Sequence, residues 1–205
     1  MNTKVLALLA ASSIFGTEIA CAVPNPTYNH LDSGFLIAQS GIDYTVSGYI
    51  PVMAQPSTMT CWATAAAVLL SWQNQASYSP EQAAAMAGSN YSQKFRSNQG
   101  LNSNEASRFL SAVGLRKQPL QGYTIRKFTA LLQSKGPLLT TTRELAGLHA
   151  RIVIGIYGDG TPNGTNLKVI DPAGGRQYTE RFSDFMRKYD RAQAETGFAV
   201  QIVHF

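Results

Sequence analysis

The order of helical and extended patterns is the feature that most restricts the fold of this chain. Apolar residues recur at helical spacing in the first half, and extended apolar runs fill the second half. Helices are expected at 61–73, 80–87, 102–114 and 124–136, and strands at 44–53 (interrupted by Pro51), 138–142, 150–157, 167–170 and 197–205. Helices followed by strands predict an α+β domain with an antiparallel sheet.

Several segments carry start, stop or loop signals. Ser79, Pro80 and Gln82 form the pattern of a capping box with proline at the first helical position. The polar segment 88–100 is expected to be a loop. Residues 158–165, which are rich in Gly, Asp, Pro and Asn, predict a hairpin loop between the strands 150–157 and 167–170.

The N-terminal residues have the pattern of an export signal. A short positive segment is followed by an apolar run and by Ala20-Cys21-Ala22, a small-x-small cleavage pattern. We expect a cleavable signal peptide at 1–22, an irregular arm at 23–43 and one domain at 44–205, in the periplasm or the medium. Lipid attachment at Cys21 is an alternative. No later run approaches the roughly 18 apolar residues of a membrane-spanning helix, so no stable membrane insertion is expected.

The formal net charge is +5, but the basic residues are scattered along the chain. Their densest group lies on an expected helix near the C-terminus and consists of Arg181, Arg187, Lys188 and Arg191. Such a group is either a solvated helix face or a weak attractor for anionic surfaces such as cell-envelope polymers. No nucleic-acid-binding motif is present, so we expect no nucleic-acid partner.

The cysteine count isolates one thiol. The chain has two cysteines, and removal of residues 1–22 leaves only Cys61. A single unpaired cysteine in an exported protein is either a buried small apolar residue or a reactive thiol. Cys61 begins a strongly apolar helical run, where unpaired N–H groups and the helix dipole favour a thiolate. Gln55, six residues upstream, can present its amide N–H beside the Cys61 backbone N–H to a developing oxyanion.

A thiol nucleophile needs a base, and the chain has three histidines. His149 precedes the apolar strand 150–157 and follows Gly147 and Leu148, an approach that suits an imidazole at a substrate cleft. His30 lies in the expected arm and His204 alternates with apolar residues on the last strand, so both are weaker candidates. The sequence therefore favours His149 as the base.

Asp171 is the best candidate to orient this histidine. It closes the strand 167–170, and a hairpin centred near Pro162 would place it roughly opposite Ile152, close to His149. It also has the position of a turn-capping aspartate before Pro172-Ala-Gly, and the two roles are compatible. Asp159 and Asn166 are weaker alternatives. Trp62 is expected either to wall the substrate cleft or to be buried at the helix start, and the chemistry requires no metal or organic cofactor.

Together these residues resemble a known group of enzymes. Gln55-x5-Cys61-Trp62, then His149-Ala150 ahead of an apolar strand, a hairpin and Asp171-Pro172 are similar to papain-like cysteine proteases. The resemblance spans 52–175 and is greatest to the compact bacterial branch, which includes secreted effector proteases of plant pathogens and bacteriocin-processing peptidases. It implies an N-terminal helical half, a C-terminal sheet half and an active site in the cleft between them.

The resemblance also implies the residue roles: Cys61 as nucleophile, His149 as base, Asp171 as orienting residue and Gln55 as oxyanion donor. Three departures bear on the substrate. Thr58-Met59-Thr60 replaces the Cys-Gly-Ser that precedes the catalytic cysteine in plant and animal papains, Asp replaces their Asn, and their disulfides are missing.

We therefore expect an exported cysteine peptidase that acts on a protein or peptide, including cell-envelope or host proteins. The same triad also serves a peptidoglycan amidase or endopeptidase, and a glutamine deamidase or transglutaminase-type toxin. A catalytically inactive adhesion or inhibitor module that keeps only the fold is a further alternative.

Overall fold

The structure is a computed structural model that describes residues 41–196 and 201–205. The expected signal peptide with Cys21, the arm as far as residue 40 with His30, and residues 197–200 lie outside the described residues. The helices are α1 Cys61–Asn74, α2 Pro80–Met86, α3 Ser89–Arg96, α4 Ser103–Ala112, α5 Ile125–Lys135 and α6 Phe182–Thr196. The strands are β1 Ile42–Thr45, β2 Arg116–Lys117, β3 Leu138–Glu144, β4 Gly147–Gly158, β5 Thr165–Asp171, β6 Arg176–Arg181 and β7 Ile202–His204.

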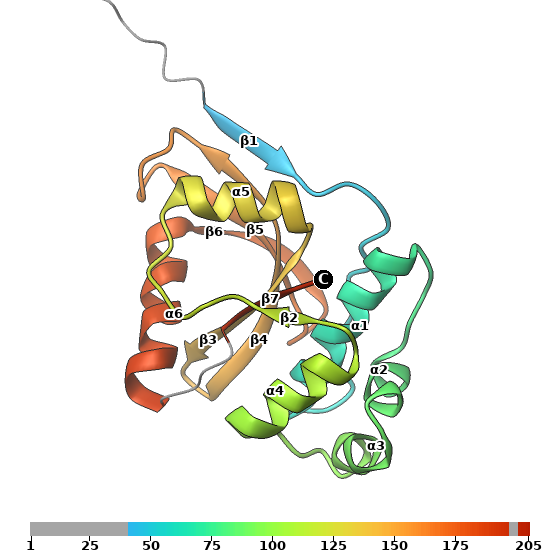
Figure 1. Ribbon diagram of the computed structural model, residues 1–205. Helices are drawn as coiled ribbons and strands as arrows, with labels where there is room; N and C mark the ends of the chain where they lie inside the picture. The colour runs from blue at the N-terminus through green and yellow to red at the C-terminus, as the bar shows by residue number, and fades with distance from the viewer. Residues whose placement is uncertain (1–40, 197–200) are drawn as a thin grey trace, which may run out of the picture. The chain divides into compact units, whose positions relative to one another are not determined.

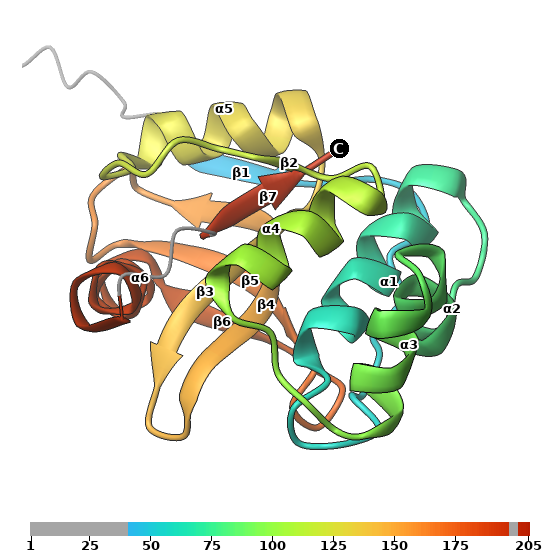
Figure 2. The same ribbon diagram turned by 60° about the horizontal axis from the view of Figure 1, so that its bottom comes forward.

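All strands of this part of the chain join one antiparallel sheet in the order β2-β7-β3-β4-β5-β6, and β1 pairs with β4. Helices α1 to α4 gather at one side of the sheet, away from α6 (Figures 1 and 2). The expected α+β class with a helical half followed by an antiparallel sheet half is therefore confirmed.

Two apolar clusters pack on the sheet. The first joins α1, α2 and α4 to sheet residues such as Ala150 and Ile152, and the second joins α5 and α6 to residues such as Val153 and Ile156. The alternation along β4 changes because a bulge lies between Val153 and Gly155. Because β4 contributes residues to both clusters, it is buried on both sides, which gives a rigid support for the residues at its N-terminal end.

Helix α1 lies within the first cluster. Residues 62–71 are all buried, so the helix is surrounded by protein except near its ends. Thr60 is the N-cap residue of α1, but no side chain caps the helix, because the Thr60 hydroxyl donates to the Ser57 carbonyl at 2.8 Å. The capping box of Ser79 and Gln82 is confirmed.

Some expected boundaries are wrong. The polar segment 88–100 contains α3, which Tyr91 and Phe95 attach to the first cluster, so tertiary contact overrides a weak local signal. Strands β2 and β6 were not expected, and the strand expected at 44–53 is only Ile42–Thr45. A two-residue turn between β3 and β4 also starts β4 at Gly147, so that His149 lies inside a strand.

Candidate active site

Cys61 is the first residue of α1 and its side chain is partly exposed. The rest of the helix is fixed by the first apolar cluster, which includes β4 residues, so the thiol stands where the helical half meets the sheet. The first N–H groups of a helix have no partner within the helix. Position, exposure and free N–H groups therefore suit a nucleophile at this residue.

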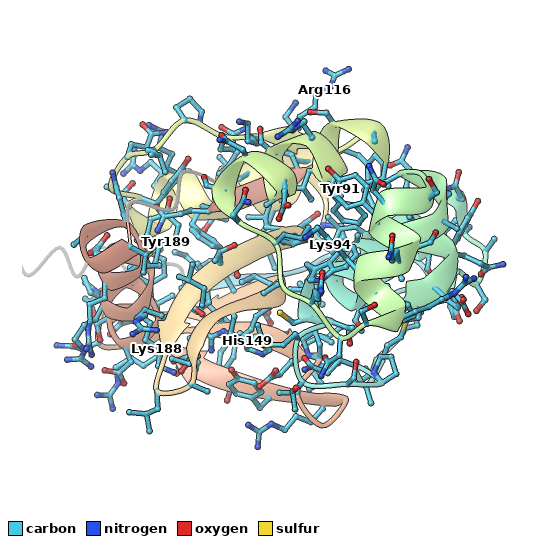
Figure 3. The ribbon with its side chains drawn as sticks, turned by 90° about the horizontal axis from the view of Figure 1, so that it is seen from below. Tyr91, Lys94, Arg116, His149, Lys188 and Tyr189 are labelled. Atoms are coloured by element: carbon cyan, nitrogen blue, oxygen red, sulfur yellow. The ribbon has the colours of Figure 1, made fainter. Side chains whose placement is uncertain are left out.

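His149 is the third residue of β4 and pairs in register with Thr142 of β3. Its side chain is 16% exposed, so one side of the ring is open to solvent while the strand ladder fixes its backbone. Figure 3 shows His149 at the sheet, between α6 and the helical half.

Asp171 is the last residue of β5, and its side chain is 7% exposed. Its Oδ1 lies 2.6 Å from His149 Nε2 and also accepts a hydrogen bond from the Ala173 N–H at 2.8 Å. Arg176 Nη2 lies 3.5 Å from the other carboxylate oxygen. The carboxylate therefore both holds the imidazole and caps the turn after β5.

The electrostatics join the three side chains. Burial alone would lower the pKa of His149, but hydrogen bonds and charge interactions with Cys61 and Asp171 outweigh it and raise that pKa. Burial alone would raise the pKa of Asp171, but hydrogen bonds from His149 and Ala173, with the charges of His149 and Arg176, hold it below its ordinary value. Because Nε2 faces Asp171, Nδ1 is the ring nitrogen left for the Cys61 thiol.

Gln55 lies in the loop before α1. Its backbone N–H donates to the Pro172 carbonyl at 2.8 Å, which ties this loop to the turn after Asp171. Its side-chain Nε2 donates to the carbonyls of Ser57 and Thr58, both at 2.9 Å, while its Oε1 is buried without a partner. The amide is thus held inside the loop, and one of these two bonds has to be exchanged before Nε2 can reach an oxyanion.

Trp62, expected either to wall the substrate cleft or to be buried at the helix start, has its ring in the helical core. The ring is 8% exposed, its Nε1 donates to the Gln99 carbonyl at 3.1 Å, and it packs edge-on against Phe109 at 4.7 Å between centroids. Trp62 therefore anchors α1 in the helical core, the alternative considered from the sequence. Gly147 and Leu148 are half-buried at the start of β4, next to His149.

The other residues weighed from the sequence lie elsewhere. Asp159 accepts hydrogen bonds from Thr161 in the loop between β4 and β5, and Asn166 is the second residue of β5, at the other end of the strand from Asp171. His204 is 3% exposed and its ring contacts the Gln118 amide. Sequence reasoning missed the contact of Gly175 with Ala54, although the Gly174-Gly175 pair was a visible signal of unusual backbone.

Among the described residues, no group of three or more His, Cys, Asp or Glu side chains is placed to hold a metal ion. Within 41–196 and 201–205, no helix has both the length and the apolar character needed to cross a bilayer.

Comparisons with known proteins identify similar structures and the family of this chain. The peptidase domain of Streptococcus ComA, a bifunctional ABC transporter, aligns with a TM-score of 0.47 and 12% identity over 77% of this chain and 97% of that domain. A structure from work on the mite allergens Blo t 1 and Der p 1 aligns with a TM-score of 0.42 and 14% identity over 89% of this chain and 74% of that one. No curated protein sequence matches significantly. The family described as papain-like cysteine protease AvrRpt2 matches residues 44–190, more than two thirds of the chain, and the chain therefore belongs to this family of cysteine peptidases.

Proposed function

We propose that this chain is an exported peptidase that hydrolyses peptide bonds through a Cys61–His149–Asp171 triad and a covalent acyl-enzyme. The observation that carries the proposal is the His149 ring, whose Nε2 lies 2.6 Å from Asp171 Oδ1 and whose pKa is raised by its interactions with Cys61 and Asp171 despite its burial. The nucleophile, the base and the orienting carboxylate come from α1, β4 and β5, so the packing of three elements brings them together.

Acylation begins when the Cys61 thiolate donates an electron pair to the substrate carbonyl carbon. A C–S bond forms and the C=O π pair moves to the oxygen. The His149 imidazolium then gives its proton to the amide nitrogen, the C–N bond breaks, and the oxygen pair re-forms C=O in a thioester. The raised pKa of His149 favours the imidazolium that supplies this proton.

Deacylation reverses these roles with water. Neutral His149 takes a proton from the water, whose oxygen bonds to the thioester carbon. The C–S bond breaks, its electron pair returns to Cys61, and the carboxylic acid leaves. Asp171 stays ionised throughout and holds the ring orientation, in keeping with its lowered pKa.

The oxyanion of both steps is assigned to the Cys61 backbone N–H and to Gln55 Nε2. Two donors at this place would contribute much of the rate, because removal of one such donor costs about 10²- to 10³-fold in kcat in a related acyl-transfer site. During the reaction Gln55 exchanges its bond with Ser57 or Thr58 for one with the oxyanion.

The proposed substrate is a protein or peptide of the cell envelope or of a host, met after export. The support for export is the signal-peptide pattern of residues 1–22, and the domain begins near residue 44 after an arm. N-terminal sequencing of the exported protein should find Val23 as the first residue. A mature protein that retains residues 1–22 would contradict this part of the proposal.

The triad is tested with a peptide library derived from a bacterial or host proteome, incubated with the reduced protein and analysed by mass spectrometry. We expect new peptide termini with the wild-type protein and none with Cys61→Ala. His149→Ala should lose at least about 10²-fold of the rate with an unchanged unfolding temperature. Cleavage that survives Cys61→Ala would refute the mechanism, and a wild-type rate in His149→Ala would move the base to another residue.

Two further outcomes would indicate an activity other than that of a peptidase acting on proteins. Release of peptides from muramyl-peptides without cleavage of the library would indicate a peptidoglycan amidase or endopeptidase. A gain of about one dalton on a glutamine-containing peptide without chain scission would indicate a deamidase.

A further inference from the structure

The loop that carries Gln55 has no helix or strand to fix it. Residues between β1 and α1 form neither, and the amide of Gln55 is held by its own loop through Ser57 and Thr58. These bonds keep the side chain within the loop but do not set where the loop stands relative to the sheet. That placement depends on contacts with two other segments. One contains Asn98, which accepts a hydrogen bond from the Met59 N–H at 2.8 Å and donates one to the Thr58 hydroxyl at 3.0 Å.

The other segment is the turn after Asp171. The Pro172 carbonyl accepts hydrogen bonds from the Gln55 N–H at 2.8 Å and from the Gly175 N–H at 3.3 Å. Gly175 also approaches Ala54 so closely that a Cβ on residue 175 would lie 2.7 Å from the Ala54 nitrogen and 2.9 Å from its Cα. Real Cβ atoms essentially never come this close to backbone, so only glycine allows the contact.

The same turn holds the orienting carboxylate. Asp171 Oδ1 accepts from His149 and from the Ala173 N–H, so residues 171–175 contact both the imidazole and the loop before α1. Oxyanion donors act only when they lie within a few tenths of an ångström of the right place, and a 1 Å error can cost about 10²-fold in rate.

We propose that Gly175 is a positioning residue for the oxyanion site: its contact with Ala54 sets the place of Gln55 relative to Cys61. This rests on the proposed function, because it assigns Gln55 to the oxyanion. A methyl group at residue 175 pushes against the Ala54 backbone and displaces the loop, while the bond between Asp171 and His149 stays in place. Oxyanion stabilisation is then lost and the Cys61–His149 pair is kept.

Two small reagents separate these effects. Iodoacetamide alkylates a thiolate by displacement at a saturated carbon and creates no oxyanion, whereas p-nitrophenyl acetate acylates it through a tetrahedral oxyanion. Neither reagent needs a peptide subsite. The ratio of the Cys61 acylation rate to its alkylation rate therefore measures oxyanion stabilisation without knowledge of the natural substrate.

Gly175→Ala should lower this ratio by about 10- to 100-fold, between a partial and a full loss of one donor. Gly174→Ala is the matched control. Both glycines have a positive φ, +90° at Gly174 and +59° at Gly175, but a Cβ on residue 174 would meet nothing within 4 Å. The control has the backbone strain without the contact, so its ratio should stay within about threefold of wild type. Gly175→Asn and Gly174→Asn repeat the pair with a residue that tolerates positive φ better, in case the alanine variant does not fold.

An unchanged ratio in folded Gly175→Ala and Gly175→Asn, or an equal fall in the Gly174 variants, would overturn the assignment of Gly175. Failure of the proposed function would give a different result, because Cys61→Ala would then still be acylated by p-nitrophenyl acetate at the wild-type rate. A fall of both rates in proportion would indicate general damage to the fold and would also count against the assignment.

Discussion

Arg151, two residues beyond His149 on β4, is the most deeply buried charged side chain described and offers the sharpest stability test. It is 1% exposed, with its Nη1 2.7 Å from Glu180 and 2.6 Å from the Tyr178 hydroxyl. Its Nη2 lies 3.2 Å from Glu144, and its guanidinium lies over the Phe185 ring at 4.9 Å. These contacts tie the β3–β4 hairpin, which carries His149, to β6 and α6. The substitution Arg151→Met removes these contacts.

The expected cost follows from what the substitution leaves behind. Removal of one partner of a buried ion pair costs about 3–5 kcal/mol, because the other charge remains buried. Here Lys188 still neutralises Glu180 at 2.7 Å and Glu144 at 3.4 Å, and methionine fills most of the vacated volume. We therefore expect the lower end, about 3 kcal/mol. In a domain of this size that corresponds to a fall in Tm of roughly 6–12 °C.

The measurement is urea unfolding followed by tryptophan fluorescence, with thermal unfolding beside it. Arg187→Met is the matched control, because Arg187 pairs with Asp184 on the surface of α6 with 67% of its side chain exposed. Such surface pairs are worth about 0–1 kcal/mol. A free energy of unfolding for Arg151→Met within about 1 kcal/mol of the control would refute the claim that this buried network stabilises the hairpin.

Two further predictions concern the residues around the triad. Asp171→Asn keeps an acceptor for His149 but removes the charge that helps to raise the pKa of His149, so the alkaline limit of the pH profile of kcat/KM for a library peptide should move to lower pH. The control Asp159→Asn removes a carboxylate from an exposed loop and should leave that limit in place. Identical pH profiles for the two variants would contradict the role of Asp171. Trp62→Ala should cost about 3–5 kcal/mol in urea unfolding because the ring is buried among aromatic residues, whereas a cleft-wall role would raise KM with little loss of stability.

The sequence predicts the parts of the site that depend on local pattern. Cys61 at a helix start and Asp171 at a strand end follow from apolar periodicity and turn residues. The hairpin loop at 158–165 made it possible to count back from Asp171 toward His149, and the observed register pairs Ile170 with Ile152. The expected pairing of residues 171 and 152 is off by one position because the bulge between Val153 and Gly155 shifts the register by one residue.

The parts that the sequence did not predict depend on contacts between distant segments. The segment 89–96 is polar, and it forms α3 because Tyr91 and Phe95 reach the aromatic cluster around Trp62. The burial of Trp62 has the same origin. Residues 172–175 read only as a turn, and nothing local distinguishes Gly174, whose Cβ would be in open space, from Gly175, whose Cβ would strike Ala54.

Two kinds of contact therefore position the side chains of the site. His149 and Asp171 are 22 residues apart but lie on neighbouring antiparallel strands, so their 2.6 Å contact is fixed by the hydrogen-bonded ladder of β4 and β5. A slip of one residue in that ladder would turn Asp171 to the other face of the sheet, which the burial of both strands opposes. Gln55 has no such ladder. Asn98 holds Thr58 and Met59 further along its loop, but Gln55 itself is tied to the sheet by one backbone hydrogen bond to Pro172 and by the close contact of Gly175 with Ala54. Orientation of the base is thus the robust half of the site, and placement of the oxyanion donor is the half that a single methyl group can disturb.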